Sequence, residues 1–172
     1  MVDADGKPLV VYHGTDADFE AFDASADPKH ISLPGFYFTP DAGVADNFSA
    51  SASRKEIRDA DGYIDGYEGA QSVAVYLSIQ NPAEIDGSET DGSMAKASRI
   101  RDELDAAMAD GHDGAVIRGW RDGSGDVQYV AFSPEQIKSV RNRGTFDAND
   151  PRILYQPAFE QQKRGSITFP AQ

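Results

Sequence analysis

The chain consists of short apolar segments separated by stretches rich in glycine, aspartate and serine, and this spacing constrains the fold most. Two longer segments have helical character: 40–52, which opens with Pro and Asp, and 94–109, whose apolar residues recur at helical spacing. We predict strands at 8–13, 35–39, 73–79, 114–118, 127–132 and 137–141. Because strands and helices do not alternate regularly, the pattern favours an α+β domain with a mostly antiparallel sheet.

The remaining segments are expected to lie outside the regular elements. Residues 16–34 are polar and predict a long loop, which Phe19 and Phe22 would pin to the core. Residues 54–71 show no clean periodicity and predict a mobile surface insertion. A length of 172 residues favours one domain, which we place at 1–156, followed by a linker or tail over 157–172.

Composition excludes several classes of protein. The chain has no cysteine, so a disulfide scaffold, a thiolate zinc site and a cysteine nucleophile are ruled out. Its three histidines are spread along the sequence, and we expect no metal site. A net charge of −13 argues against a phosphate-tracking surface. With no signal peptide and no apolar run long enough to span a membrane, we expect a monomer in the cytoplasm of a host or target cell.

Three segments carry the functional information: Tyr12-His13-Gly14-Thr15, Gly35-Phe36-Tyr37-Phe38-Thr39 and Gln128-Tyr129-Val130-Ala131-Phe132. The first ends an apolar run that predicts a strand. A histidine beside a glycine at a strand end places an imidazole next to bare backbone. That pair suits recognition of a ribose hydroxyl and an amide.

In this order, with Phe48 as a second aromatic after the middle segment, the segments resemble the ADP-ribosyltransferase superfamily. The resemblance is to its His-Tyr-Glu branch, the diphtheria-toxin and poly(ADP-ribose)-polymerase type. It implies a split β-sandwich of two small, mostly antiparallel sheets with flanking helices, and NAD as co-substrate without a metal. The flanks at 5–15 and 146–156 resemble domains of phage and mobile-element polyproteins, which implies one domain of a longer protein, such as a toxin or effector.

The resemblance also implies roles for individual residues. His13 would hydrogen-bond the adenosine ribose, and Gly14 would offer its backbone to the nicotinamide amide. Thr15 would add a hydroxyl contact. Tyr37 would stack on the nicotinamide ring, and Phe48 would close the other face. In this assignment His13 and Tyr37, together with the third-motif residue Gln128, form the catalytic set.

Two positions depart from the resembled pattern. Relatives often have a serine where this chain has Ala45, and the branch has a glutamate where this chain has Gln128. A glutamate carboxylate there would bind the nicotinamide-ribose hydroxyl and stabilise a cationic transition state, whereas glutamine keeps only the hydrogen bonding. Asp126, two residues earlier on the same strand face, is the candidate to replace that charge or to orient an acceptor. Further candidate acceptor contacts are Trp120 and Arg121, with Arg118 beside them.

The resemblance therefore implies a mono-ADP-ribosyltransferase that transfers ADP-ribose from NAD to a protein or nucleic-acid acceptor. Gln128 leaves alternatives open: an NAD glycohydrolase in which water is the acceptor, or a non-catalytic NAD-binding module. An unrelated α+β domain would show no change in melting temperature with NAD.

Overall fold

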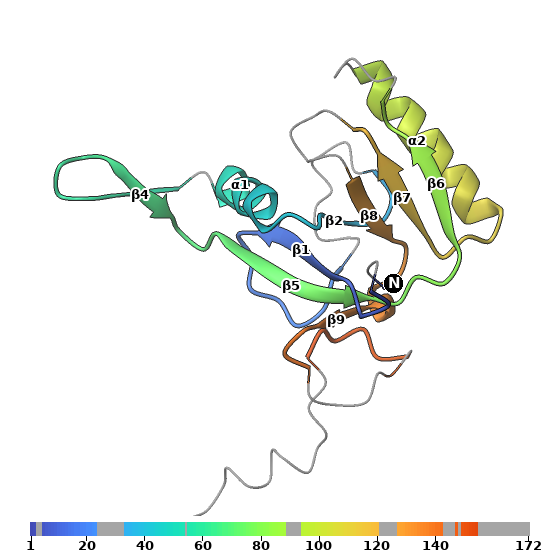
Figure 1. The fold of residues 1–172 in the computed structure, drawn as a ribbon. Helices are drawn as coiled ribbons and strands as arrows, with labels where there is room; N and C mark the ends of the chain where they lie inside the picture. Colours follow the sequence, from blue (N-terminus) through green and yellow to red (C-terminus); the bar gives the residue numbers. More distant parts are fainter. Residues whose placement is uncertain are drawn as a thin grey trace, which may run out of the picture.

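The computed structural model describes residues 1–2, 5–23, 33–53, 55–88, 94–120, 127–142, 147 and 149–154, without the side chains of 94–97. Figure 1 shows two sheets of unequal size, each with a helix packed against it, and a hairpin that projects from the body. The elements are β1 (Val10–Thr15), β2 (Phe36–Phe38), α1 (Ala42–Ser53), β3 (Glu56–Arg58), β4 (Ile64–Tyr67), β5 (Gln71–Leu77), β6 (Pro82–Asp86), α2 (Met94–Ala109), β7 (Gly114–Arg118), β8 (Val127–Ala131) and β9 (Ile137–Ser139).

The first sheet has the order β1-β5-β9 and is antiparallel throughout. Val11 faces Val75 across it, and both side chains are almost fully buried. They belong to an aromatic and aliphatic core cluster that includes Phe22 from the loop after β1 and Ile153 near the end of the described chain. The predicted pinning of the polar loop by its two phenylalanines is confirmed, because Phe22 is 7% exposed and Phe19 packs against the same cluster.

The second sheet has the order β2-β8-β7-β6 and lies beside α2. Its β2-β8 and β8-β7 pairs are antiparallel, while β6 and β7 run parallel because α2 connects them. Ile100 and Leu104 of α2 are fully buried in a second core cluster with Ala115 and Ile117 of β7. This cluster explains the helical spacing of apolar residues in 94–109, and the predicted helix has the observed bounds.

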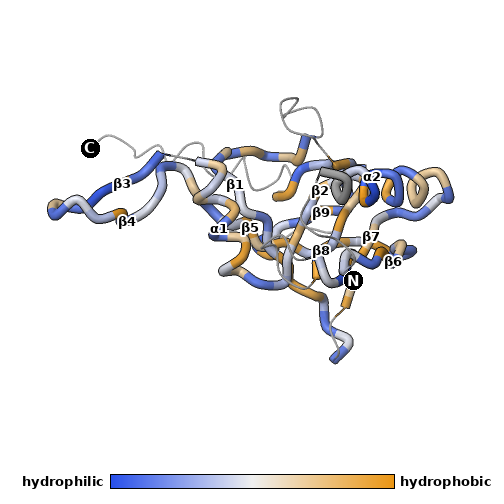
Figure 2. The backbone as a smooth tube through the Cα atoms, turned by 90° about the horizontal axis from the view of Figure 1, so that it is seen from above, coloured by the Kyte–Doolittle hydropathy of each residue, from blue (hydrophilic) through white to orange (hydrophobic). Residues whose placement is uncertain are grey.

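The two sheets meet where β1 passes the end of β2. The N–H of Tyr12 donates to the carbonyl of Thr39 at 2.8 Å, and the N–H of Thr39 donates back at 3.0 Å. α1 follows directly and packs on β1. In Figure 2 the hydrophobic colours gather in this central region, whereas the outer segments are mostly hydrophilic. The α+β fold with small, mostly antiparallel sheets is therefore confirmed.

Residues 54–71 were predicted to be a mobile surface insertion with no strand assigned, and the described part contains two strands. Strands β3 and β4 form a two-stranded antiparallel hairpin that extends away from the body (Figure 1). Asp59 closes its turn, since its carboxylate accepts the N–H groups of Asp61 and Tyr63. These two strands could not be predicted from the sequence, because their residues are exposed to solvent on both faces and polar and apolar residues do not alternate.

Strand β6 was not predicted, because it opens with a proline and carries few apolar residues. Proline is compatible with the first residue of an edge strand, and β6 is the edge of its sheet. The tail over 157–172 lies outside the described residues, and so do residues 146, 148, 155 and 156 of the 146–156 flank. Neither described helix is long and apolar enough to cross a membrane.

Candidate functional site

A cavity of about 180 Å³ lies where the two sheets and α1 meet. It draws together residues from all three segments singled out in the sequence, and from the helix that follows the second segment. Its lining consists of Tyr12, His13, Gly14, Tyr37, Phe38, Thr39, Ala45, Phe48 and Gln128. Segments separated by more than a hundred residues in the chain therefore share one concave site.

His13 is held from several sides. Its Nδ1 lies 2.9 Å from the carbonyl oxygen of Tyr37, so Nδ1 carries the proton and donates it. The ring packs edge-on against Phe22 at 5.0 Å and tilted against Phe38 at 5.6 Å, measured between ring centroids. Burial among these rings lowers the pKa of the imidazole, which outweighs the opposite effect of the Tyr37 carbonyl. The neutral tautomer thus leaves Nε2 as a hydrogen-bond acceptor.

Gly14 is required by the packing of α1. A Cβ at this position would lie 2.0 Å from the carbonyl oxygen of Ala45 and 2.8 Å from the backbone nitrogen of Ser49. Hydrogen-bonding direction alternates along an antiparallel strand, and Tyr12 directs its N–H and C=O to Thr39. Two residues later, Gly14 directs its own N–H and C=O to that same side, away from β5. Bare backbone is therefore presented at the cavity wall.

Tyr37 lies on the face of β2 opposite to Phe36 and Phe38, which are both buried in the first core cluster. Its ring packs edge-on against Trp120 at 6.5 Å, and its hydroxyl donates to the carbonyl of Pro34 at 3.4 Å. Burial raises the pKa of this hydroxyl far above its usual value, so Tyr37 stays neutral. The ring can therefore offer an aromatic surface to the cavity but cannot act as a phenolate base.

Gln128 reaches the cavity from β8. Tyr37 pairs with Val130 across the sheet, and Gln128 lies two residues before Val130, so all three side chains share one sheet face. Gln128 is only 6% exposed. Burying a polar side chain at a cavity wall costs free energy unless it is hydrogen-bonded, and Gln128 places the donor and acceptor groups of an amide there.

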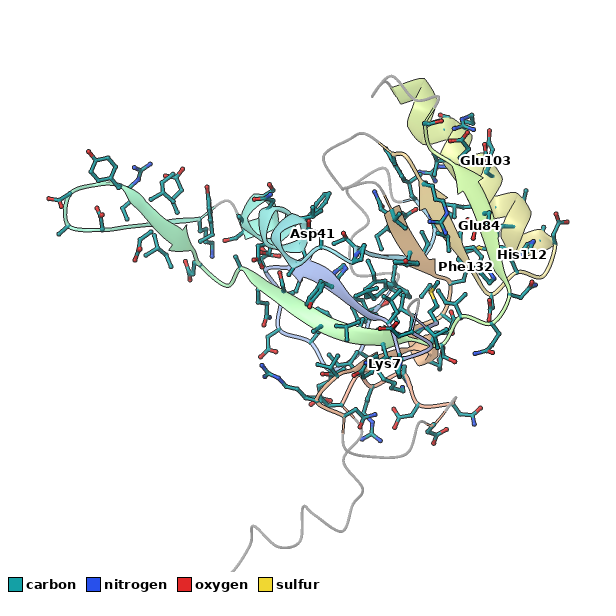
Figure 3. All side chains as sticks on the ribbon, viewed as in Figure 1. Lys7, Asp41, Glu84, Glu103, His112 and Phe132 are labelled. Carbon is teal, nitrogen blue, oxygen red and sulfur yellow. The ribbon has the colours of Figure 1, made fainter. Side chains whose placement is uncertain are left out.

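α1 supplies the remaining wall. The carboxylate of Asp41 accepts the N–H of Gly43 at 2.8 Å and that of Val44 at 3.3 Å, which starts the helix at the end that joins β2 (Figure 3). Ala45 is buried against Gly14, while Phe48, one turn later, is 47% exposed. An aromatic ring of this size at the cavity rim is only partly covered by protein atoms.

Several predicted site residues lie elsewhere. Thr15 is buried, and its hydroxyl accepts the N–H of Ala17 at 3.1 Å, so it does not line the cavity. Trp120 is buried in the second core cluster and reaches the site through Tyr37. Arg118 is exposed and pairs with Glu84 at 3.0 Å. Asp126 and Arg121 lie outside the described residues.

The structure also adds residues that sequence reasoning did not assign to the site. Tyr12, Phe38 and Thr39 line the cavity, and Tyr12 and Thr39 tie the two sheets together beneath it. Their position next to His13 and Tyr37 in the two segments was the available signal. Within the described part of the chain, no cluster of three His, Cys, Asp or Glu side chains could hold a metal ion.

The cavity can hold a small planar ring with an amide, between aromatic side chains and a free backbone edge. The sequence matches the model of one protein family, described as ADP-ribosyltransferase in polyvalent proteins, over residues 3–146. No curated protein and no solved structure matches the chain. The matched range includes every residue that lines the cavity.

Proposed function

The chain belongs to the family of ADP-ribosyltransferases in polyvalent proteins, and from that premise we propose that it is a mono-ADP-ribosyltransferase of the His-Tyr-Glu branch. It moves ADP-ribose from NAD to a protein or nucleic-acid group, as one domain of a longer polyprotein. The observation that carries the proposal is the convergence of His13, Gly14, Tyr37, Phe48 and Gln128 on one cavity.

The cavity is suited to the nicotinamide end of NAD. Its volume of about 180 Å³ is below the roughly 300–1,000 Å³ of pockets that enclose a drug-sized ligand, so it fits the ring better than the whole dinucleotide. Tyr37 and Phe48 provide aromatic surfaces on which a flat ring can stack. The N–H and C=O of Gly14 complement the C=O and N–H of a carboxamide.

His13 would recognise a ribose. Its Nδ1 proton is committed to the Tyr37 carbonyl, so Nε2 can accept a hydrogen bond from a hydroxyl. Because burial keeps the imidazole neutral, this acceptor is present at physiological pH. The histidine therefore positions the co-substrate instead of transferring a proton.

In the reaction, the bond between the nicotinamide nitrogen and ribose C1′ breaks, and its electron pair leaves with nicotinamide. A lone pair of the acceptor forms the new bond to C1′, and the acceptor releases a proton. Positive charge develops on the ribose as the bond breaks. Tyr37 and Phe48 orient the leaving ring, while the amide oxygen of Gln128 offers a dipole to that charge but no full negative charge.

Gln128 favours a second candidate, an NAD-binding module with little or no transfer. A buried amide in place of a carboxylate retains hydrogen bonding to the ribose and loses the charge that stabilises the cationic state. An NAD glycohydrolase, with water as acceptor, would need the same stabilisation of the cationic state. Gln128 therefore argues against efficient hydrolysis as well as efficient transfer.

The experiment uses NAD labelled in its adenosine part, incubated with the full chain and a cell lysate. Mass spectrometry of proteins and nucleic acids is expected to find single ADP-ribose additions, absent with Tyr37→Ala. NAD binding is followed separately by the shift in melting temperature. If the chain binds NAD but gives no labelled product, it is a binding module and not a transferase. If it releases nicotinamide in the absence of an acceptor, it is a glycohydrolase.

A further inference from the structure

We infer that residues 149–154, which lie beyond the matched range of 3–146, form a strap that positions His13 by fixing the loop that carries Phe22. As a claim about NAD binding, this inference rests on the proposed function. As a claim about the geometry of His13, it stands on the contacts of the strap alone.

The strap is anchored on one side to β9. The N–H of Ser139 donates to the carbonyl of Ile153 at 2.8 Å. The Nζ of Lys138, a side chain only 4% exposed, donates to the carbonyls of Asp150 and, at 3.0 Å, Arg152. A buried ammonium group is costly unless its hydrogens are bonded, so Lys138 is used to hold this backbone in place.

On its other side the strap holds the loop after β1. The N–H of Ile153 donates to the carbonyl of Glu20 at 2.8 Å, and Arg152 forms a β-bridge with Ala21. The Ile153 side chain, 7% exposed, joins the core cluster that contains Phe22. The strap thus lies between β9 and the loop like an additional short strand.

The loop in turn supports His13. Phe22 is the ring nearest to the imidazole, with centroids 5.0 Å apart, and it also contacts Phe36 at 5.3 Å and Phe38 at 5.5 Å. Among its neighbours in the loop, Glu20 and Asp23 are acidic, and Phe19 packs on Phe22 with ring centroids 4.8 Å apart. Phe22 is therefore a positioning residue: it excludes water from one edge of His13 and keeps Nδ1 directed at Tyr37.

The test compares two isoleucines of similar burial in the full chain, Ile153→Ala in the strap and Ile85→Ala in the second core cluster. Both remove the same volume and are expected to lower the melting temperature by about 5–15 °C. Nitrogen chemical shifts of the three histidines, with His13→Gln for assignment, report which ring nitrogen of His13 is protonated and the pH at which it titrates.

For Ile153→Ala we expect the titration of His13 to move up toward its ordinary pH, the Nδ1–H tautomer to lose dominance, and the dissociation constant for NAD to rise about tenfold, as expected for one weakened hydrogen bond. At a temperature where the Ile85→Ala variant is folded, we expect the titration of His13, its tautomer and the dissociation constant for NAD to be unchanged. If both variants lower the melting temperature equally and neither changes the tautomer or titration of His13, the inference that the strap positions His13 is wrong.

Lys138→Met provides a second variant if Ile153→Ala unfolds the chain, because methionine keeps an apolar stem and removes the ammonium group that bonds to the strap. It is expected to shift His13 in the same direction, and an unchanged His13 would overturn the inference. The histidine measurement needs no NAD. If the wild-type chain binds no NAD, the proposed function is therefore wrong, while the role of the strap is still tested by the nitrogen shifts of His13.

Discussion

The cavity wall and the β3-β4 hairpin are built from the same residue types and behave in opposite ways. Each contains a glycine and a tyrosine: Gly14 and Tyr37 at the cavity, Gly66 and Tyr63 in the hairpin. A Cβ on Gly14 would lie 2.0 Å from the carbonyl oxygen of Ala45, whereas a Cβ on Gly66 would meet no atom within 4 Å. At the cavity wall a glycine is needed because other atoms pack closely against it. In the hairpin the glycine has no close neighbours, so a side chain would also fit.

The tyrosines differ in the same way. Tyr37 is buried enough to raise its hydroxyl pKa, while Tyr63 at the hairpin turn is 74% exposed. A two-stranded hairpin is marginal in water unless it packs against something else, and this one contacts the body mainly near its base, where Ser53 of α1 donates to the carbonyl of Glu68. Composition alone therefore does not identify a site, since the same residues become functional only where neighbouring elements enclose them.

The largest predicted effect tests that contrast between glycines. Gly14→Ala places a methyl group 2.0 Å from the Ala45 carbonyl, so α1 must move away from β1. We expect a loss of about 3 kcal/mol in the free energy of unfolding, measured by urea denaturation, and loss of NAD binding. Gly66→Ala is the matched control and is expected to change stability by less than about 0.5 kcal/mol. Equal effects in the two variants would contradict the contrast.

The second prediction concerns charge at the wall. Gln128→Glu restores the carboxylate of the resembled branch at a buried position, and we expect nicotinamide release from NAD to rise about 100-fold, since preorganised groups at developing charge contribute on this scale. The reverse exchange in the hairpin, Glu56→Gln, removes an exposed carboxylate and is expected to leave turnover unchanged. No gain in Gln128→Glu, with NAD binding retained, would indicate that the wall is not arranged for transfer.

The sequence could predict those parts of the fold in which burial follows periodicity. Ile100 and Leu104 fall at helical spacing because one face of α2 is buried, and strand 114–118 is a continuous apolar run because its residues are covered on both faces. The hairpin and β6 could not be predicted, because their residues meet solvent or lie at a sheet edge and so leave no apolar pattern.

The site was predictable to the extent that it lies in short motifs. His13, Tyr37 and Gln128 were identified from such segments, and they line one cavity. Thr15 and Trp120 were assigned from their place in or near the motifs. Thr15 shares its strand face with His13 but is buried one step further along, where its hydroxyl accepts the N–H of Ala17, and Trp120 belongs to the second core cluster. Contacts between partners distant in sequence, such as the hydrogen bond from Ile153 to Glu20, cannot be read from the local sequence.

The third prediction uses the lowered pKa of His13. Because the folded chain binds this proton less readily than the unfolded chain, the stabilising contribution is complete above pH 6.5 and is lost as the pH falls toward the folded value. We expect the melting temperature to fall over this window, and His13→Gln to remove that part of the pH dependence. Asp150, whose pKa is lowered to about 2, acts in a separate window below its usual value of 3.8. A wild-type melting temperature constant between pH 6.5 and 4.5 would contradict the burial of a neutral imidazole.

The smallest effect is expected from the hairpin itself. Ile57 and Ile64 are about half exposed, so Ile57→Ser and Ile64→Ser together remove little buried apolar area. We expect the melting temperature to change by less than about 3 °C and NAD affinity to stay within about twofold. The control is Val75→Ser in β5, where a fully buried side chain becomes polar and the fold is expected to be lost. A large loss of stability in the double variant would mean that the hairpin packs against the domain in solution, and the difference between a packed cavity wall and an unpacked hairpin would no longer hold.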